Sequence, residues 1–171
     1  SGGTVNIHGG TVRSENDFGV QINGAGTLKI TGGSVVSGSG TAVALRNDNM
    51  DNMEKSAEIT GGSVLSERGT AVLVSGGALR VTGGSITGWT GGIFNQTKDS
   101  KVTISGGVIT LSADSPSPGK EFAVNAAEIT GGTLRAKDQS CIAGRGVSAE
   151  LPPPGAEKDY YVCTVGGSGT P

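Results

Sequence analysis

The chain has 171 residues, and 32 of them are glycine, well above the usual share of about 7%. Only 16% of the residues are charged and the net charge is −2, which excludes a nucleic-acid binder that relies on a strong basic field. Hydrophobic residues make up 34% of the chain, enough for a core, and no apolar run approaches the roughly 20 residues of a membrane-spanning helix. We therefore expect one folded domain that neither binds nucleic acid nor inserts into a membrane.

The first element in chain order belongs to a repeat. Six segments are variants of the pattern Ile-Thr-Gly-Gly-Ser/Thr-Val and begin 22 to 29 residues apart: 7–12, 30–35, 59–64, 81–86, 104–109 and 129–134. Each copy is rich in Val, Ile and Thr that alternate with period two, which predicts strands. A period of this length indicates a solenoid whose unit is the size of one turn of a parallel β-helix.

Each repeat divides into three predicted strands. The first runs into the glycine pair, as in 27–30, and the second follows it, as in 34–36. The third is the run 41–45, with counterparts at 70–74, 92–94 and 122–124. Glycine adopts positive φ without a Cβ penalty, so the pair marks a turn. We predict an all-β fold: a right-handed parallel β-helix of about seven coils, three short strands per coil, roughly 34 Å long.

Stacking of the coils predicts columns of side chains. The isoleucines of the repeat point inward, and the residue before each points outward, giving the column Asn6, Lys29, Glu58, Arg80, Thr103 and Glu128. The next outward column is mostly hydroxyl: His8, Thr31, Thr60, Thr82, Ser105 and Thr130. A third-strand column is less polar: Gln21, Ala44, Leu73, Phe94 and Asn125. Opposite charges on successive coils are expected to attract one another.

The two ends of the chain differ. Residues 1–10 match residues 75–84, so the chain begins inside the repeat pattern, and we expect it to be a fragment of a longer protein with further domains. The repeat fades after Leu134, and 151–171 contains prolines and glycines. We therefore predict β-helix coils over 1–150 and a C-terminal cap and linker over 151–171.

The two cysteines, Cys141 and Cys163, are 22 residues apart, which is close to one coil. They are placed to face each other on adjacent coils, and a disulfide there would imply an oxidising compartment. The alternative is two buried thiols, since cysteine packs well as a small apolar residue. The sequence leaves both interpretations open.

The longest repeat contains an insert, 46–55, rich in Asn and Asp. Carboxylate and amide oxygens on a loop are the ligands that Ca²⁺ prefers, which makes Asp48 and Asp51 candidate calcium ligands. The spacing fits no EF-hand loop, and Asn and Asp are common in any turn. A solvated loop without a cofactor is the favoured interpretation.

Catalysis is not expected within this chain. Glycan-cleaving β-helices need two or three carboxylates that converge on one face, whereas the aspartates here occupy unmatched turns and inserts. His8, the single histidine, lies in the hydroxyl column, far from a nucleophile in another coil. One histidine and two cysteines also provide no zinc ligand set.

A glycan-binding surface is suggested by the single tryptophan, Trp89, in the turn 88–91. An aromatic ring can stack on the apolar face of a sugar while cations take hydroxyls or carboxylates. The candidate glycan-binding residues are therefore Trp89, Arg68, Arg46 and Phe94. The alternative is that Trp89 folds over the coil edge or packs on a neighbouring domain.

The Ile-Thr-Gly-Gly-Ser/Thr-Val repeat over residues 1–135 resembles secreted, cell-surface β-helix proteins of bacteria, including a carbohydrate-binding family that binds acidic plant polysaccharide with calcium. Residues 91–95 are also similar to the glycine-rich passenger domains of autotransporter adhesins. These resemblances imply an extracellular or cell-surface module, a rigid spacer or adhesive domain that contacts polysaccharide or host glycan. The alternative is the β-helix part of a glycan-cleaving or other multidomain enzyme whose catalytic residues lie elsewhere. Ice binding through the hydroxyl column is a weaker third hypothesis, because the second rank is mostly serine and is broken by Val108.

Overall fold

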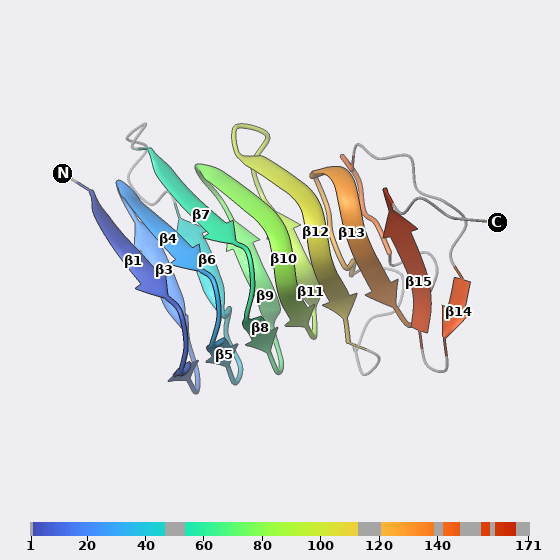
Figure 1. Ribbon diagram of the computed structural model, residues 1–171, viewed down its shortest axis with the longest axis horizontal. Coiled ribbons are helices and arrows are strands. Elements are labelled where there is room, and N and C mark those ends of the chain that lie inside the picture. Colours follow the sequence, from blue (N-terminus) through green and yellow to red (C-terminus); the bar gives the residue numbers. More distant parts are fainter. Residues whose placement is uncertain are drawn as a thin grey trace.

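A computed structural model describes residues 2–46, 54–112, 121–138, 142–147, 155–157 and 160–166. These residues form strands and turns without a helix, and the strands stack from the blue N-terminal end to the red C-terminal end of an elongated molecule (Figure 1). The strands are β1 (Gly3–Ile7), β2 (Thr11–Ser14), β3 (Val20–Asn23), β4 (Gly26–Ile30), β5 (Ser34–Ser37), β6 (Val43–Arg46), β7 (Lys55–Ile59), β8 (Ser63–Ser66), β9 (Thr70–Val74), β10 (Ala78–Gly88), β11 (Gly91–Asn95), β12 (Lys101–Leu111), β13 (Glu128–Ala136), β14 (Gly155–Glu157) and β15 (Tyr160–Val165).

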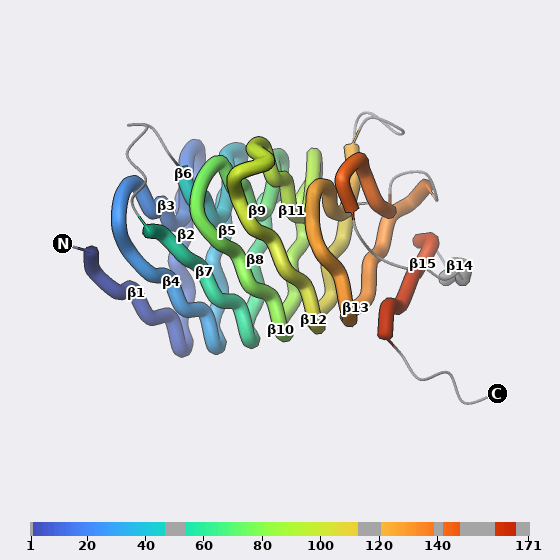
Figure 2. Tube along the Cα trace, turned by 90° about the horizontal axis from the view of Figure 1, so that it is seen from above, coloured from blue at the N-terminus to red at the C-terminus, as the bar shows by residue number. Residues whose placement is uncertain are grey.

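The chain winds as a parallel solenoid of about five turns. We number them coil 1 (β1 to β3), coil 2 (β4 to β6), coil 3 (β7 to β9), coil 4 (β10 and β11) and coil 5 (β12 and the bridge at Val124). One sheet has the order β1-β4-β7-β10-β12-β13-β15-β14 and also takes in β2, β5 and β8, while a second sheet has the order β11-β9-β6-β3. The two ends of the described chain lie at opposite ends of the stack (Figure 2).

The prediction of about seven coils was wrong. Strand β15 pairs antiparallel with β13, from Gly132↔Val165 to Ala136↔Tyr161, and its arrow runs against that of β13 (Figure 1). β14 then pairs antiparallel with β15. Because the chain reverses direction here, it cannot stack another parallel coil on β13, and the winding ends. The last segment of the chain therefore adds strands to the same sheet.

The inward isoleucine column and the outward column that begins at Asn6 are confirmed, whereas Ala44 of the third-strand column is 0% exposed. Ile7, Ile30 and Ile59 are partners in register on β1, β4 and β7, and their side chains are 7%, 0% and 0% exposed. The outward column is in register from Asn6 to Glu128 across six strands. A period of two sends successive side chains to opposite faces, so a shift by one residue would expose the isoleucines. The core therefore lies inside the coils and runs along the whole stack.

The glycine pair has two separate steric roles. A Cβ on the first glycine, for example Gly61 or Gly83, would lie within 3.0 Å of the carbonyl oxygen of Thr31 or Thr60 in the preceding coil. The second glycine has positive φ, as at Gly62 (φ 76°), a conformation that other L-residues rarely adopt. The pair recurs because the coils approach each other closely at this turn and the backbone bends there.

Candidate functional site

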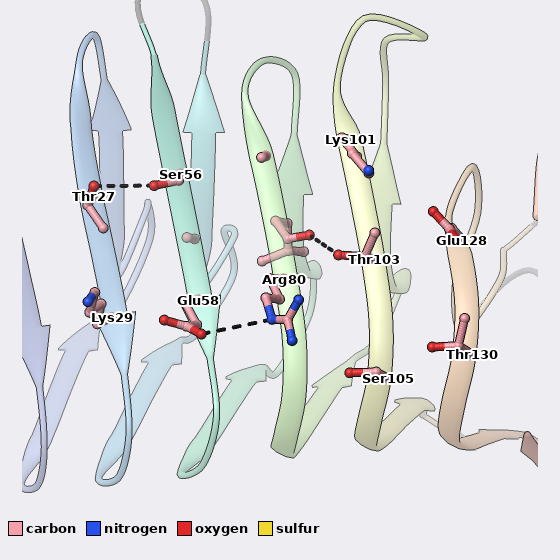
Figure 3. A pocket seen from close by; sticks show the side chains of 13 residues that line it. Thr27, Lys29, Ser56, Glu58, Arg80, Lys101, Thr103, Ser105, Glu128 and Thr130 are labelled. Carbon is pink, nitrogen blue, oxygen red and sulfur yellow. Dashed lines mark hydrogen bonds and ion pairs between the residues drawn. The ribbon is translucent and has the colours of Figure 1, made fainter. Parts of the chain in front are cut away.

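The outward face of the long sheet carries a shallow polar groove of about 690 Å³ (Figure 3). It crosses β4, β7, β10, β12 and β13, so it runs along the stack rather than along a strand. Its polar lining consists of hydroxyl and charged side chains: Thr27, Lys29, Ser56, Glu58, Arg80, Lys101, Thr103, Ser105, Glu128 and Thr130. The groove contains most of the predicted column that begins at Asn6, namely Lys29, Glu58, Arg80, Thr103 and Glu128, but only Ser105 and Thr130 of the predicted hydroxyl column. A further row two residues earlier on each strand, Thr27, Ser56, Ala78 and Lys101, was not predicted.

Charges of opposite sign alternate along the first three coils of this groove. Lys29 is the register partner of Glu58, and Glu58 is the partner of Arg80. The Arg80 Nε lies 4.0 Å from Glu58 Oε1, with side chains that are 63% and 40% exposed. Water screens such an exposed contact, so it adds little stability. These charges therefore remain accessible to a ligand.

Hydroxyl groups extend the same surface. Thr27 Oγ1 and Ser56 Oγ are 3.2 Å apart on neighbouring coils, as the dashed line in Figure 3 shows. His8 lies in the hydroxyl column, and its Nδ1 is 2.7 Å from Thr31 Oγ1. Hydroxyls that bond across coils form a regular array of donors and acceptors. The arrangement provides polar contacts at repeated spacing.

The two carboxylates of the groove are far from each other. Glu58 and Glu128 are separated in register by Arg80 and Thr103, three strand spacings in all. At about 4.8 Å per spacing this corresponds to roughly 14 Å. Paired carboxylates in glycosidases are about 5 to 9.5 Å apart. The spacing of Glu58 and Glu128 therefore suits ligand contact better than acid–base catalysis.

The structure separates the four predicted glycan-binding residues. Trp89 is half-buried, and its backbone N–H donates to the carbonyl oxygen of Gly69 (2.9 Å), so its turn lies next to the turn of exposed Arg68. Arg46 ends β6, but its guanidinium reaches back to 5.3 Å from the centre of the ring of Phe18, which precedes β3. Phe94 lies on β11 and is 41% exposed.

Phe94 lines a cleft of about 400 Å³ on the outward side of the second sheet. The other lining residues are Thr70, Thr90, Gly91, Ile93, Glu121, Phe122, Asn125 and Arg145. Thr70 Oγ1 and Thr90 Oγ1 are 3.1 Å apart. Two aromatic rings, a hydroxyl pair, a guanidinium and a carboxylate thus meet in one concave site.

Sequence reasoning missed Phe122 and Arg145 as members of this cleft. Val124 forms isolated bridges with Ile93 and with Ala143, which bring three distant segments side by side. Phe122 precedes Val124 by two residues and Arg145 follows Ala143 by two, so both lie beside the bridges. The sequence already matched residues 122–124 with residues 92–94 as third strands of successive coils, and this match could have placed Phe122 near Phe94. The segment around Arg145 lies beyond the last repeat, and no sequence pattern indicated its position next to Phe94.

The remaining predicted site residues fall partly outside the described chain. Asp48, Asp51 and Cys141 lie outside the described residues, so the calcium site and the disulfide stay predictions. Cys163 is buried on β15, 2% exposed, and this burial raises the pKa of its thiol. Within the described ranges no three His, Cys, Asp or Glu side chains gather in a way that could hold a metal ion.

Along the described part of the chain, no helix is sufficiently long and apolar to cross a bilayer. Comparison with protein-family models, with curated proteins and with solved structures finds no match to this chain.

Proposed function

We propose that this chain is a non-catalytic β-helix module of a secreted or cell-surface bacterial protein, a rigid adhesive or spacer domain that binds glycan in the Phe94 cleft. The observation that carries the proposal is the exposed Phe94 ring (41%) in a cleft with a second aromatic ring, Phe122. A phenyl face offers an apolar surface to the C–H face of a pyranose ring. A solvent-exposed aromatic ring in a concave site is a feature that folding alone does not require.

The polar residues of the cleft suit the rest of a sugar. The Thr70 and Thr90 hydroxyls can donate to and accept from ring hydroxyls, and Asn125 is anchored to the backbone of Asn95 beside them. No described residue makes a hydrogen bond or ion pair with the exposed Arg145 guanidinium, whose five N–H donors suit hydroxyl or carboxylate oxygens. We infer a ligand that presents both an apolar ring face and several oxygens.

The rigid-module part of the proposal is supported by the stacking. Each coil bonds to its neighbours through parallel strands, and the core runs through all coils without a break among the described residues. A stack of this kind is an extended, quasi-one-dimensional module in which each coil contacts its neighbours, and it holds the cleft at a constant place along the stack. We propose the right-handed sense for the coil, as parallel β crossovers almost always have it.

The alternative function is a β-helix part of a glycan-cleaving or other multidomain enzyme whose catalytic residues lie outside this chain. Two observations favour binding over cleavage here. Glu58 and Glu128 are roughly 14 Å apart, and among the described residues that line the cleft Glu121 is the one carboxylate. Release of reducing sugar or unsaturated product from pectin, xylan or host glycans would favour the enzyme instead.

A glycan array with and without Ca²⁺ tests the proposal, using the whole chain and four variants. Phe94→Ala should abolish binding, whereas Tyr161→Ala, which removes an aromatic ring of similar exposure (39%) on β15, should leave binding unchanged. Trp89→Ala should also retain binding, because Trp89 does not line the cleft. Dependence on Ca²⁺ would point to Asp48 and Asp51.

Other results would redirect the assignment. If Arg80→Ala abolished binding while Phe94→Ala retained it, the ligand would lie in the polar groove of Figure 3 and the cleft assignment would be wrong. Absence of binding to every glycan would leave the spacer role without a glycan ligand. Circular dichroism of each variant shows that a loss of binding is not a loss of fold.

A further inference from the structure

A buried asparagine interrupts an inward column of the second sheet that is otherwise apolar. Ile22, Leu45, Val74 and Asn95 are partners in register on β3, β6, β9 and β11. Asn95 is 6% exposed, and Leu45 and Val74 are fully buried. A buried amide costs free energy unless it forms hydrogen bonds, whereas an apolar side chain at the same place would extend the core. The column therefore departs from its pattern on the strand that carries the cleft's exposed aromatic ring.

The Asn95 side chain binds the backbone of the neighbouring segment 121–126, which contributes Phe122 and Asn125 to the cleft. Asn95 Nδ2 donates to the carbonyl oxygen of Ala126 (2.9 Å). In the opposite direction, the Asn95 backbone N–H donates to Asn125 Oδ1 (2.8 Å). Each of the two asparagine side chains thus bonds to the main chain of the other segment. These two bonds join β11 to one wall of the cleft.

The asparagine bonds lie where the backbone pairing of β11 with this segment ends. Ile93 N–H donates to the Ala123 carbonyl oxygen (2.9 Å), and Asn125 N–H donates to the Ile93 carbonyl oxygen (3.2 Å). At the next position along β11, the Asn95 N–H donates to a side-chain oxygen. The bridge between Ile93 and Val124 is isolated, in contrast to the continuous pairing of β11 with β9. The two asparagines therefore extend the attachment of the wall beyond its backbone ladder.

The residue that Asn95 holds has an uncommon backbone conformation. Ala126 has a φ of 45°, the one positive value at a non-glycine position within the described ranges. Its carbonyl oxygen accepts the bond from Asn95, and its N–H donates to the carbonyl oxygen of Arg145 (2.9 Å). Alanine keeps a left-handed backbone where the surrounding contacts fix it. Through Ala126, the Asn95 amide is thus linked to the segment that brings Arg145 to the cleft.

We propose that Asn95 is a positioning residue of the Phe94 cleft. Its buried amide holds residues 125–126 beside β11, and this contact sets where Phe122 and Arg145 lie relative to Phe94. The inference rests on the proposed glycan function, for which a fixed wall matters, since a preorganised site loses less conformational freedom on binding. An apolar residue at position 95 would suit the core but would release the wall. The repeat pattern is thus broken here in favour of the site.

Asn95→Leu tests the proposal, because leucine has a similar shape to asparagine and already occurs in this column at Leu45. The amide protons of Ala126 and Gly144, which bond to carbonyl oxygens within the wall, should exchange at least about tenfold faster. Amides of β6 and β9 should keep their exchange rates. Phe94-dependent signals on a dilution series of the glycan array should weaken at least about tenfold. The melting temperature should stay within about 4 °C of the original chain.

A matched control and a second variant keep the test specific. Thr97→Ala removes the hydroxyl contact with Ser100 (2.6 Å) in the turn after Asn95 and keeps the Asn95 amide. This control should change neither the exchange of the two wall amides nor the array signals. Asn95→Val, which copies Val74 of the preceding strand, replaces the leucine variant if circular dichroism shows that the latter does not fold.

The outcomes separate the positioning role from the glycan proposal. Unchanged exchange at Ala126 and Gly144 would overturn the role of Asn95, as would full Phe94-dependent binding in the apolar variant. Faster exchange throughout β6 and β9, or failure of both apolar variants to fold, would show that the amide serves the whole core and would overturn it too. If no array signal depends on Phe94, the glycan proposal fails, and the two wall amides alone decide the role of Asn95.

Discussion

Arg13 in coil 1 binds Glu67 in coil 3, 54 residues later in the chain, with Nη1 2.9 Å from Glu67 Oε1. The same guanidinium lies 2.7 Å from Glu15 through Nε. In register, Val36 of coil 2 stands between Arg13 and Leu65, so the arginine side chain spans a whole coil. The contact ties coil 1 to coil 3.

This relationship predicts a local and pH-dependent effect of Arg13→Ala. The Arg13 guanidinium lowers the pKa of the Glu15 carboxyl, mainly by their hydrogen bond. A carboxyl whose pKa is lowered by folding contributes stability above its unfolded pKa, about 4.3, and loses it as the pH falls through the lower folded value. Arg13→Ala should therefore speed hydrogen exchange in β2 at pH 7, with a small change in melting temperature, and the difference from the original chain should shrink as the pH falls below about 4.3.

A control variant tests whether removing a different, exposed arginine has the same effect on β2. Arg80→Ala removes an exposed cation whose nearest carboxylate oxygen is 4.0 Å away, and it should leave β2 exchange unchanged. An Arg13→Ala difference that persisted undiminished at pH 3 would show that the effect does not depend on the carboxylates.

The assignment of inward and outward columns predicts opposite results for two aspartate substitutions. Ile104 is 0% exposed, so Ile104→Asp should prevent folding, because an unpaired buried charge costs several kcal/mol. Thr60 is exposed, and Thr60→Asp should change the free energy of unfolding by no more than about 0.5 kcal/mol. Urea unfolding followed by circular dichroism measures both. A folded Ile104→Asp chain would mean that the columns are exchanged.

The stacked glycines predict a steric cost at one position and tolerance at another. In Gly83→Ala the new Cβ would press on the Thr60 carbonyl oxygen, and separation of the coils should cost about 1 to 3 kcal/mol. At Gly91 the nearest atoms would be 3.6 Å from a Cβ, an ordinary contact, so Gly91→Ala should be close to neutral. Thermal unfolding of the two variants compares them directly. Equal stability would contradict the close approach of coils 3 and 4.

A buried serine predicts a hydrogen-bond effect at the turn between β8 and β9. Ser66 is 1% exposed; its hydroxyl donates to the Gly40 carbonyl oxygen (2.6 Å) and accepts from the Gly69 N–H (2.8 Å). Ser66→Ala leaves both backbone groups without this partner and should cost about 1 to 3 kcal/mol. Ser63→Ala, on the same strand but half-buried, is the control and should cost less than about 0.5 kcal/mol. Urea unfolding measures the free energy of unfolding of both variants. Equal losses of stability would show that the two hydrogen bonds of the Ser66 hydroxyl do not stabilise the turn.

Much of the fold could be predicted from local pattern. The glycine pairs placed the turns, and period-two alternation assigned Lys29, Glu58 and Arg80 to one outward column, which the strand register confirms. These features follow from neighbours in the chain, because each repeat must bury the same positions against the next one.

The candidate site was less accessible from the sequence. Phe94 was identified as an outward aromatic residue. Of its neighbours in the cleft, Phe122 belongs to a third-strand counterpart that was not assigned to the site, and Arg145 lies after the last repeat. Trp89, Arg68 and Arg46 looked equivalent by proximity in the repeat, yet the Arg46 guanidinium reaches back to the ring of Phe18, which precedes β3. Which residues form a site that spans several coils depends on the position of each side chain around its coil, and spacing along the chain does not give that position.

The sequence by itself determined the solenoid, its strand faces and its glycine turns, because these depend on local conformation and on burial repeated at a constant period. Only the tertiary structure decided where the winding stops, how Arg13 reaches Glu67 and which side chains enclose the cleft. The physical reason is that these features join residues from different coils through contacts outside the repeat, and no periodic signal records such contacts.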